Sequence, residues 1–384
     1  MKKKLFYISF ALVFVLALTL VPTTAAVGVP ADVESAIIAA SDRLEDVQNT
    51  DGGFPWVLPS STSYTNLTGV TAMGILKAYD YNNKHKYRVA LGEAYKYIDD
   101  YAPVYTWDVG DAEYDESTEG CDSFPDITFL VELADAAESD SALLSAIAGV
   151  VPGTTAADIA ALAKARWDTR IETYGSTVET PLDGTAASTV ERIREARKTS
   201  YPGLTVWDPM LGVQAALALD SAYPGEGYDV QAGDIATVIY NTVDNLSYFD
   251  STDPMQDSYV LGLAGAIWTY AKLGIYPTEL ADLTAKLLAA QETDGSWADV
   301  QSTAYAILAL MEEGSNTSIN AVKKGIDWLV SNQTVDGGWI DEGIEYPEVD
   351  GEAACAMARY LGSGSVNLTA NIPDIVAISV DPGS

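Results

Sequence analysis

Six alanine-rich segments of this chain are apolar on every side of the helix that each would form. A helix that is apolar all round must be buried all round. These segments are 66–80, 124–137, 207–223, 255–274, 299–314 and 349–362. Between them lie segments whose apolar residues follow the i, i+3, i+4, i+7 spacing of a half-exposed helix. These are 32–48, 87–101, one helix within 155–199, 234–249, 279–291 and 319–332. The alternation predicts an all-α fold, an (α/α)6 toroid of six helical hairpins with the apolar helices inside.

A repeated turn supports this arrangement. The pattern Gln-x-x-Asp-Gly-x-aromatic occurs three times, where an outer helix would end and the chain would return to an inner one. Glycine supplies the positive φ of a tight exit, the glutamine amide can bond free backbone groups, and the aromatic ring can cover the turn. We predict a structural role for these residues, which are Gln48, Gln291, Trp297, Gln333 and Trp339.

The last copy resembles a known motif. Residues 324–339, KGIDWLVSNQTVDGGW, are similar to the QW motif of squalene and hopene cyclases, with Lys324, Trp328, Gln333 and Trp339 among the matching positions. The resemblance implies membership of the terpenoid cyclase and protein prenyltransferase α/α-toroid superfamily, and it covers about residues 32–362. In that family the QW motifs strengthen the toroid and lie outside the active site. The same ring fold also occurs in some polysaccharide lyases.

The active-site motifs of these families are not retained. Cyclases of the hopene type use an Asp-x-Asp-Asp acid motif, of which this chain keeps Asp299 alone, with Gln301 and Ser302 at the other acid positions. A prenyltransferase zinc site needs histidine, and the only histidine, His85, lies in a charged stretch that is typical of an exposed helix start. The chain therefore resembles the superfamily in architecture and departs from it in chemistry.

Carboxylates stand at the start of the later inner helices, at one rim of the predicted ring. One interpretation is helix capping, because an acid in the first turn satisfies free N–H groups. The other is a cavity mouth lined by acids and aromatic rings. For that case the candidate catalytic residues are Asp208, Asp257 and Asp299, and the candidate ligand-binding residues are Asp126, Trp207, Tyr259, Trp297, Tyr305 and Glu352. Asp350 belongs to the same group of acids.

Three functions remain open on this interpretation. The first is binding of a small molecule, a glycan or a protein at the acidic rim. The second is a carbohydrate-active enzyme, a polysaccharide lyase or a glycoside hydrolase that uses paired carboxylates. The third is a terpenoid cyclase with Asp299 as the acid. The acid-rich stretch 108–126 is interpreted as a solvated loop, with Ca²⁺ binding through its oxygen ligands as the alternative and as the one cofactor considered.

The N-terminus predicts export. Three lysines, an apolar run and small residues through Ala26 form a signal-peptide pattern over 1–26, with a retained anchor as the alternative. No later stretch is long and apolar enough to span a membrane. We therefore expect a secreted or cell-surface protein whose toroid domain is 27–362. Five glycosylation sequons become relevant outside the cell, at Asn66, Asn245, Asn316, Asn332 and Asn367.

The net charge and the composition limit the kinds of partner that this chain could bind. The formal net charge of −34 repels phosphate backbones, so we expect no nucleic-acid partner, and it suits neutral or cationic ligands. Two cysteines, Cys121 and Cys355, would form one disulfide or stay free. Residues 363–384 form a Gly/Ser linker and an alternating, β-like tail, which indicates part of a larger modular surface protein.

Overall fold

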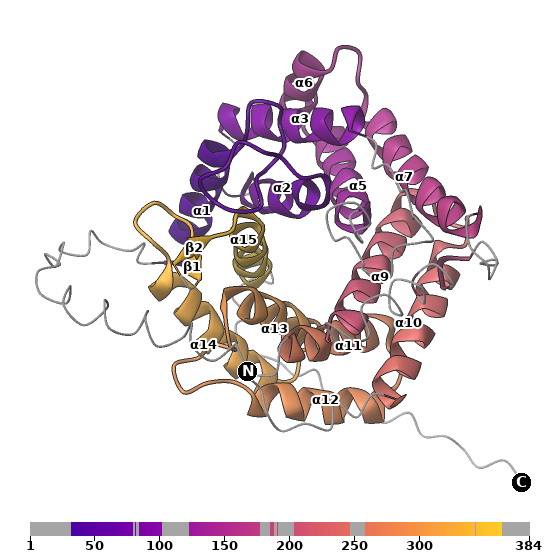
Figure 1. Ribbon diagram of the computed structural model, residues 1–384, viewed down its shortest axis with the longest axis vertical. Coiled ribbons are helices and arrows are strands. Elements are labelled where there is room, and N and C mark those ends of the chain that lie inside the picture. The colour runs from indigo at the N-terminus through magenta and orange to yellow at the C-terminus, as the bar shows by residue number, and fades with distance from the viewer. Residues whose placement is uncertain are drawn as a thin grey trace, which may run out of the picture.

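The structure is a computed structural model. It describes residues 32–79, 81, 84–101, 123–176, 185–187, 190, 203–245, 258–341 and 343–362. Within these residues six helices form a closed inner ring (Figure 1). They are α2 (Thr65–Tyr79), α5 (Ser123–Ser139), α9 (Leu204–Ala222), α11 (Tyr259–Leu273), α13 (Val300–Glu313) and α15 (Pro347–Gly362). Each packs against the next, and α15 packs against α2 to complete the circle.

A second set of helices surrounds this ring. The outer helices are α1 (Val33–Val47), α3 (His85–Asp100), α6 (Ser141–Val150), α7 (Ala156–Ser176), α10 (Tyr228–Asn245), α12 (Pro277–Ala289) and α14 (Asn316–Asn332). The predicted all-α toroid is therefore confirmed. The helix α6 was not predicted, and Asp140 caps its start by accepting a hydrogen bond from the backbone N–H of Ala142 at 2.7 Å.

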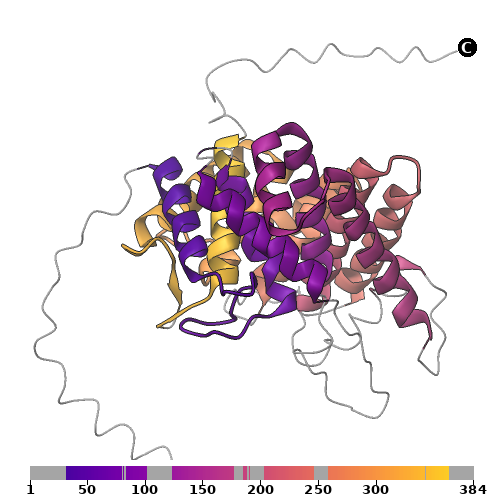
Figure 2. The same cartoon turned by 90° about the horizontal axis from the view of Figure 1, so that it is seen from above.

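Two short strands are the exception to the helical fold in the described part of the chain. β1 (Ile340–Asp341) and β2 (Ile344–Glu345) pair antiparallel between α14 and α15, at one rim of the ring (Figures 1 and 2). The predicted β-like tail at 363–384 and the signal peptide at 1–26 lie outside the described residues. No described helix is both long and apolar enough to pass through a membrane.

Glycine permits the close contact between α15 and α2 that closes the inner ring. A Cβ added at Gly74 of α2 would lie 2.8 Å from the Cα of Gly351 in α15, and one added at Gly351 would lie 2.9 Å from the Cα of Thr71. Any larger residue at either position would push the two backbones apart. The apolar, small-residue character of these segments in the sequence therefore corresponds to a tight helix–helix crossing.

The three repeated turns share one set of contacts. In each, the glutamine side-chain Nε2 donates to the carbonyl of a glycine in its own turn and to a carbonyl of the next outer helix around the ring. The pairs are Gln48 with Gly52 (2.8 Å) and Ala90 (3.0 Å), Gln291 with Gly295 (2.9 Å) and Ala321 (2.9 Å), and Gln333 with Gly337 (2.7 Å) and Ala36 (2.9 Å). Each glutamine thus ties one outer helix to its neighbour.

The turn glycines lie against the same neighbouring helices. Gly52, Gly295 and Gly337 have φ of +93°, +104° and +97°. A Cβ at these positions would lie 2.2–2.6 Å from a backbone carbonyl oxygen of the neighbour, three residues after the carbonyl that the glutamine binds. The indole N–H groups of Trp297 and Trp339 donate to the carbonyls of Leu287 and Leu329, at 2.8 and 2.9 Å, and hold the returning chain to the helix it has left.

Candidate functional site: the central cavity

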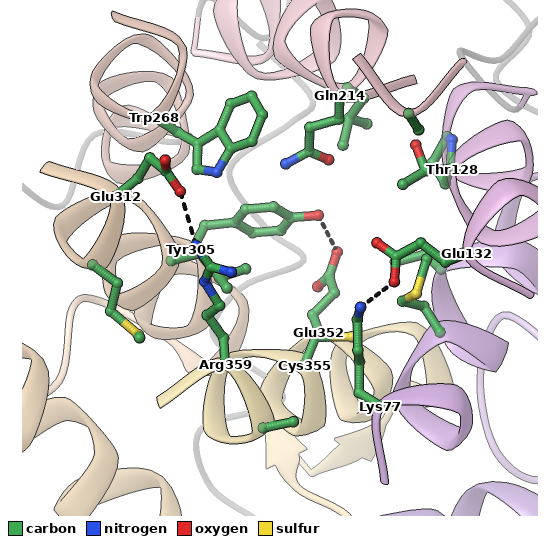
Figure 3. A pocket seen from close by; sticks show the side chains of 18 of the residues that line it. Lys77, Thr128, Glu132, Gln214, Trp268, Tyr305, Glu312, Glu352, Cys355 and Arg359 are labelled. Carbon is green, nitrogen blue, oxygen red and sulfur yellow. Dashed lines mark hydrogen bonds and ion pairs between the residues drawn. The ribbon is translucent and has the colours of Figure 1, made fainter. Parts of the chain in front are cut away.

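A cavity of about 720 Å³ lies inside the inner ring (Figure 3). All six inner helices of the described chain line it. Its apolar wall includes Val70, Met73, Leu211, Leu308 and Met311, and its polar and aromatic lining includes Lys77, Thr128, Glu132, Gln214, Trp268, Lys272, Tyr305, Glu312, Glu352 and Arg359. A mostly apolar hollow with a few polar groups is typical of a small-molecule site.

Glu352 is the buried acid of this cavity. It lies in the first half of α15, and its residue is 2 % exposed. The hydroxyl of Tyr305 donates to its Oε1 at 2.9 Å, and Gln301 Nε2 donates to its Oε2 at 3.0 Å. Both donors come from the adjacent helix α13, so the packing of α13 on α15 orients the carboxyl. Figure 3 shows the bond from Tyr305. We refer to Glu352 and Tyr305, which line the cavity, together with Gln301, which bonds Glu352 from outside the lining, as the cavity floor.

Burial sets the protonation of the floor. The pKa of Glu352 is raised well above its usual value, first by burial and then by the nearby carboxylate of Glu348, while the bonds from Tyr305 and Gln301 act in the opposite direction. Burial also raises the pKa of the Tyr305 hydroxyl well above its usual value, and the Glu352 carboxyl adds to this effect. Glu352 therefore keeps its proton to a higher pH than an exposed glutamate does.

Charges nearer the C-terminal ends of the inner helices are paired with one another. Lys77 forms an ion pair with Glu132, and Glu312 accepts contacts from Arg359 at 3.2 Å and from Lys272 at 3.4 Å. The Arg359 side chain is 57 % exposed, in contrast to the buried floor. The cavity is thus graded from a solvated end, where three basic side chains contact two acidic ones, to a buried end whose lining includes one acid, Glu352. We call the charged end the mouth.

The thiol of Cys355 also lines the cavity. Burial raises its pKa to about 12, so the thiol is protonated at neutral pH. Cys121, with which Cys355 would form a disulfide unless both stay free, lies outside the described residues.

The acids predicted from the helix starts lie mostly in packing contacts between the helices. Asp126 accepts from the backbone N–H of Gly69 in α2 at 2.8 Å, Asp208 is fully buried within α9, and Asp350 accepts from the N–H of Trp339 at 2.7 Å. Asp299 caps α13 through the N–H of Ser302 at 2.6 Å, and burial raises its pKa. These four residues do not line the cavity described above, whereas Glu352 does. Asp257 lies outside the described residues.

The predicted aromatic residues divide in the same way. Tyr305 lines the cavity, and Trp207 packs edge-to-face on it with ring centroids 5.3 Å apart. Tyr259 and Trp297 are buried in the helix packing and are not part of the lining. The expected mouth at the helix starts differs from the observed cavity because the first turns pack against neighbouring inner helices and the returning loops.

Sequence reasoning missed several lining residues, including Lys77, Glu132, Gln214, Trp268 and Arg359. A signal for them exists. Polar residues recur inside otherwise apolar inner helices, as with Thr128 and Glu132 in α5 and Gln214 in α9. Such residues would be costly in a closed core, so they indicate a face that borders a cavity.

No cluster of three or more His, Cys, Asp or Glu side chains suited to a metal ion occurs among the residues that the structure describes. Most of the acid-rich stretch 108–126, for which Ca²⁺ was considered, lies outside them.

Comparison with known proteins finds solved structures with a similar fold. No protein-family model and no curated protein matches the sequence. Solved structures with a similar fold include an apo variant of the type II terpene cyclase MstE from Scytonema, at 12 % identity and a TM-score of 0.47, covering 86 % of this chain and 97 % of that one. An unsaturated glucuronyl hydrolase from Streptococcus agalactiae matches at 15 % identity and a TM-score of 0.45, covering 85 % and 90 %.

A third neighbour, an unsaturated glucuronyl hydrolase specific for heparin, matches at 12 % identity and a TM-score of 0.46, covering 88 % and 99 %. The terpene cyclase has also been solved with its substrate, geranylgeranyl dihydroxybenzoate; this form matches at 13 % identity and a TM-score of 0.46, covering 86 % and 97 %. At these identities the neighbours resemble this chain at the level of the fold.

Proposed function

We propose that this protein binds a small organic molecule in the central cavity of its toroid, with Glu352 as the polar anchor. The observation that carries the proposal is a buried carboxyl that faces a cavity (Figure 3) and is oriented by two donors from the neighbouring helix. Burying an ionisable group costs stability unless its surroundings compensate. An apolar side chain would fill this position at lower cost, so the acid is better explained by a ligand than by the fold.

The dimensions and chemistry of the cavity support the same function. Its volume of about 720 Å³ lies within the range of small-molecule sites. The wall offers apolar contact from Leu211, Leu308 and Met311, while Gln214 and Thr128 offer hydrogen bonds. Such a lining suits a ligand with an apolar body and a small number of polar groups.

Ligand screening tests this function. The full chain would be measured by thermal shift and by ligand-observed NMR against neutral oligosaccharides and against apolar amines, alcohols and acids, with and without Ca²⁺. We expect at least one of these classes to bind, and Leu211→Trp, which puts a larger side chain into the cavity wall, to weaken the signal. Binding that persists unchanged in Leu211→Trp would place the ligand elsewhere and contradict the proposal.

Hydrolysis of a glycosidic bond is the second candidate, because one cavity holds two carboxyls in different surroundings. Glu352 is buried and hydrogen-bonded, whereas Glu132 is partly exposed and ion-paired with Lys77. A protonated carboxyl can serve as the acid and an ionised one as the base or nucleophile, and Trp268 offers a face for a sugar ring. Loss of released reducing sugar in Glu352→Gln, on a panel of polysaccharides, is the expected result.

We propose in addition that the protein is exported by the signal peptide at 1–26 and acts at the cell surface or outside the cell, as one part of a modular protein. Asn316 and Asn332 are exposed at the two ends of α14, which is compatible with glycosylation there. Asn66 and Asn245 lie within α2 and α10, and Asn367 lies outside the described residues. Mass spectrometry of the protein from its natural host would show both the cleaved N-terminus and any attached sugar.

A further inference from the structure

We infer that the cavity floor binds the ammonium group of an organic cation, with the Glu352 carboxylate as its counter-ion and the cavity wall around its apolar body. This inference rests on the proposed small-molecule function and names the chemical class of the ligand. The Tyr305 hydroxyl and the Gln301 amide orient the carboxylate for the ligand.

The first argument is the lack of a counter-charge at the floor. Among the described residues no lysine or arginine is ion-paired with Glu352. The neighbouring charges that act on Glu352 most strongly are the carboxylates of Glu348 and Asp299, which are also negative. A cation that reaches this position gains attraction from all three acids in a region that water does not screen well.

The second argument is that the cations of the cavity are already engaged. Lys77 is paired with Glu132, and Lys272 and Arg359 share Glu312. An anionic ligand would have to compete with these carboxylates at the mouth and would then meet another acid at the floor. The net charge of −34 adds a field that draws cations toward the molecule and repels anions.

The third argument concerns the kind of cation. A protein metal site needs several ligating side chains, and the described residues hold no cluster of that kind. An alkylammonium group needs one carboxylate and tolerates aromatic neighbours, because a cation is attracted to the face of a ring. Trp268 and Tyr305 provide such rings on the cavity wall (Figure 3).

Binding of the cation should release a proton. Without a ligand, burial and the nearby acids disfavour the charged form of Glu352 and raise its pKa, so that it holds its proton to a higher pH than an exposed glutamate. When an ammonium group binds, Glu352 loses that proton to solvent, and the ammonium keeps its own. The ionisable groups that act on Glu352 are Glu348, Asp299 and Tyr305, of which Tyr305 lines the cavity. Those that act on the neighbouring thiol of Cys355 are Lys77 and Glu132, which belong to the mouth.

Three probes with the same apolar body test the inference. The full chain would be titrated with 4-phenylbutylammonium, 4-phenylbutanol and 4-phenylbutyrate and followed by calorimetry or ligand-observed NMR. We expect the cation to bind about tenfold more tightly than the alcohol, and the anion to bind most weakly. We also expect the affinity for the cation to rise between about pH 5 and pH 8, where the alkylamine stays protonated, and that for the alcohol to stay level.

Two variants separate charge from shape. Glu352→Gln keeps the size and the hydrogen-bonding oxygen but removes the charge. The variant should therefore bind the cation and the alcohol about equally tightly. Glu34→Gln removes an exposed acid from the outer helix α1 and should keep the preference. If Glu352→Gln does not fold, the pH dependence of cation binding to the unaltered protein still tests whether a carboxylate holds the cation.

The outcomes are distinguishable. Equal or tighter binding of the alcohol, or a preference unchanged in Glu352→Gln, would overturn the ammonium site and leave the small-molecule function standing. If phenylbutyrate binds most tightly, the cavity prefers anions and the inference of an ammonium site is wrong. Failure of all three probes to bind at millimolar concentration would overturn this inference, while the proposed small-molecule function would still be decided by the wider ligand screen.

Discussion

The side-chain amide of Gln333 donates a hydrogen bond to the backbone carbonyl of Ala36 at 2.9 Å, across 297 positions of the sequence. Gln333 follows the last outer helix, α14, and Ala36 lies in the first, α1. The same amide also binds the carbonyl of Gly337 in its own turn at 2.7 Å. One buried side chain therefore joins the two ends of the outer ring.

Replacing Gln333 with alanine should destabilise the protein, because two buried carbonyls lose their donor. We expect a loss of about 1–3 kcal/mol in the free energy of unfolding, measured with urea. Gln291→Ala removes the equivalent two bonds, one to Gly295 in its own turn and one to Ala321 of α14, and neither joins the ends of the chain. The rate of backbone amide hydrogen exchange in α1 should rise in Gln333→Ala and stay unchanged in Gln291→Ala. Equal exchange rates in α1 of the two variants would contradict a ring-closing role for Gln333.

Gly337 should tolerate substitution much less well than Gly343, although both have positive φ, +97° and +87°. A Cβ at Gly337 would lie 2.2 Å from the carbonyl oxygen of Ala39, whereas one at Gly343 meets nothing within 4 Å. Gly343→Ala should therefore cost about 1 kcal/mol of stability through backbone strain, and Gly337→Ala at least about 2 kcal/mol more. Thermal or urea unfolding of the two variants checks this, and similar losses would show that α1 can move away.

Asp350 should make the protein less stable as the pH rises. Burial and the carboxylate of Glu345, which Arg43 holds at 2.6 and 2.7 Å, raise the pKa of Asp350 well above its usual value. The folded state therefore keeps a proton that the unfolded state has lost. The contribution of Asp350 is fully present below the unfolded pKa, about 3.9, and is lost as the pH rises toward the folded pKa.

Asp350→Asn removes this dependence while keeping an oxygen to accept from Trp339. We expect the difference in unfolding free energy between Asp350→Asn and the unaltered protein to shift in favour of the variant as the pH rises from about 4 to 8. Asp229→Asn, at an exposed position of α10, provides the control for loss of one negative charge. A difference that is flat with pH would disprove the assignment.

Cys355 should react slowly with thiol reagents in the folded protein. Its pKa of about 12 leaves little thiolate at pH 8, so alkylation by iodoacetamide should be at least about tenfold slower than for a free cysteine thiol. A Cys121→Ser background confines the reaction to this residue. Because Cys355 lines the cavity, a ligand that occupies the cavity should slow the reaction further, whereas acceleration would contradict either its burial or the location of the ligand.

Much of the architecture could be predicted from the sequence because the signals are local and repeated. A helix such as α11 is apolar on all sides, so its burial follows from composition alone. The turns at Gln48, Gln291 and Gln333 recur with the same spacing, and each needs glycine for its conformation. The helix α6 was not predicted because it is a short additional outer helix between α5 and α7. The alternation of one inner and one outer helix does not call for it.

The candidate site could not be predicted in the same way. Asp126, Asp299 and Glu352 all stand near the start of an inner helix, yet Glu352 alone of these lines the cavity. Which of them does so depends on the rotation of each helix about its axis, and this rotation is set by packing against two neighbours and an outer helix. The sequence by itself determined a ring of buried helices joined by stapled turns, since apolar periodicity and turn chemistry act over a few residues. Only the tertiary structure decided that Glu352, Tyr305 and Gln301 meet at the floor of a cavity, because side chains on separate helices come together only when the ring closes.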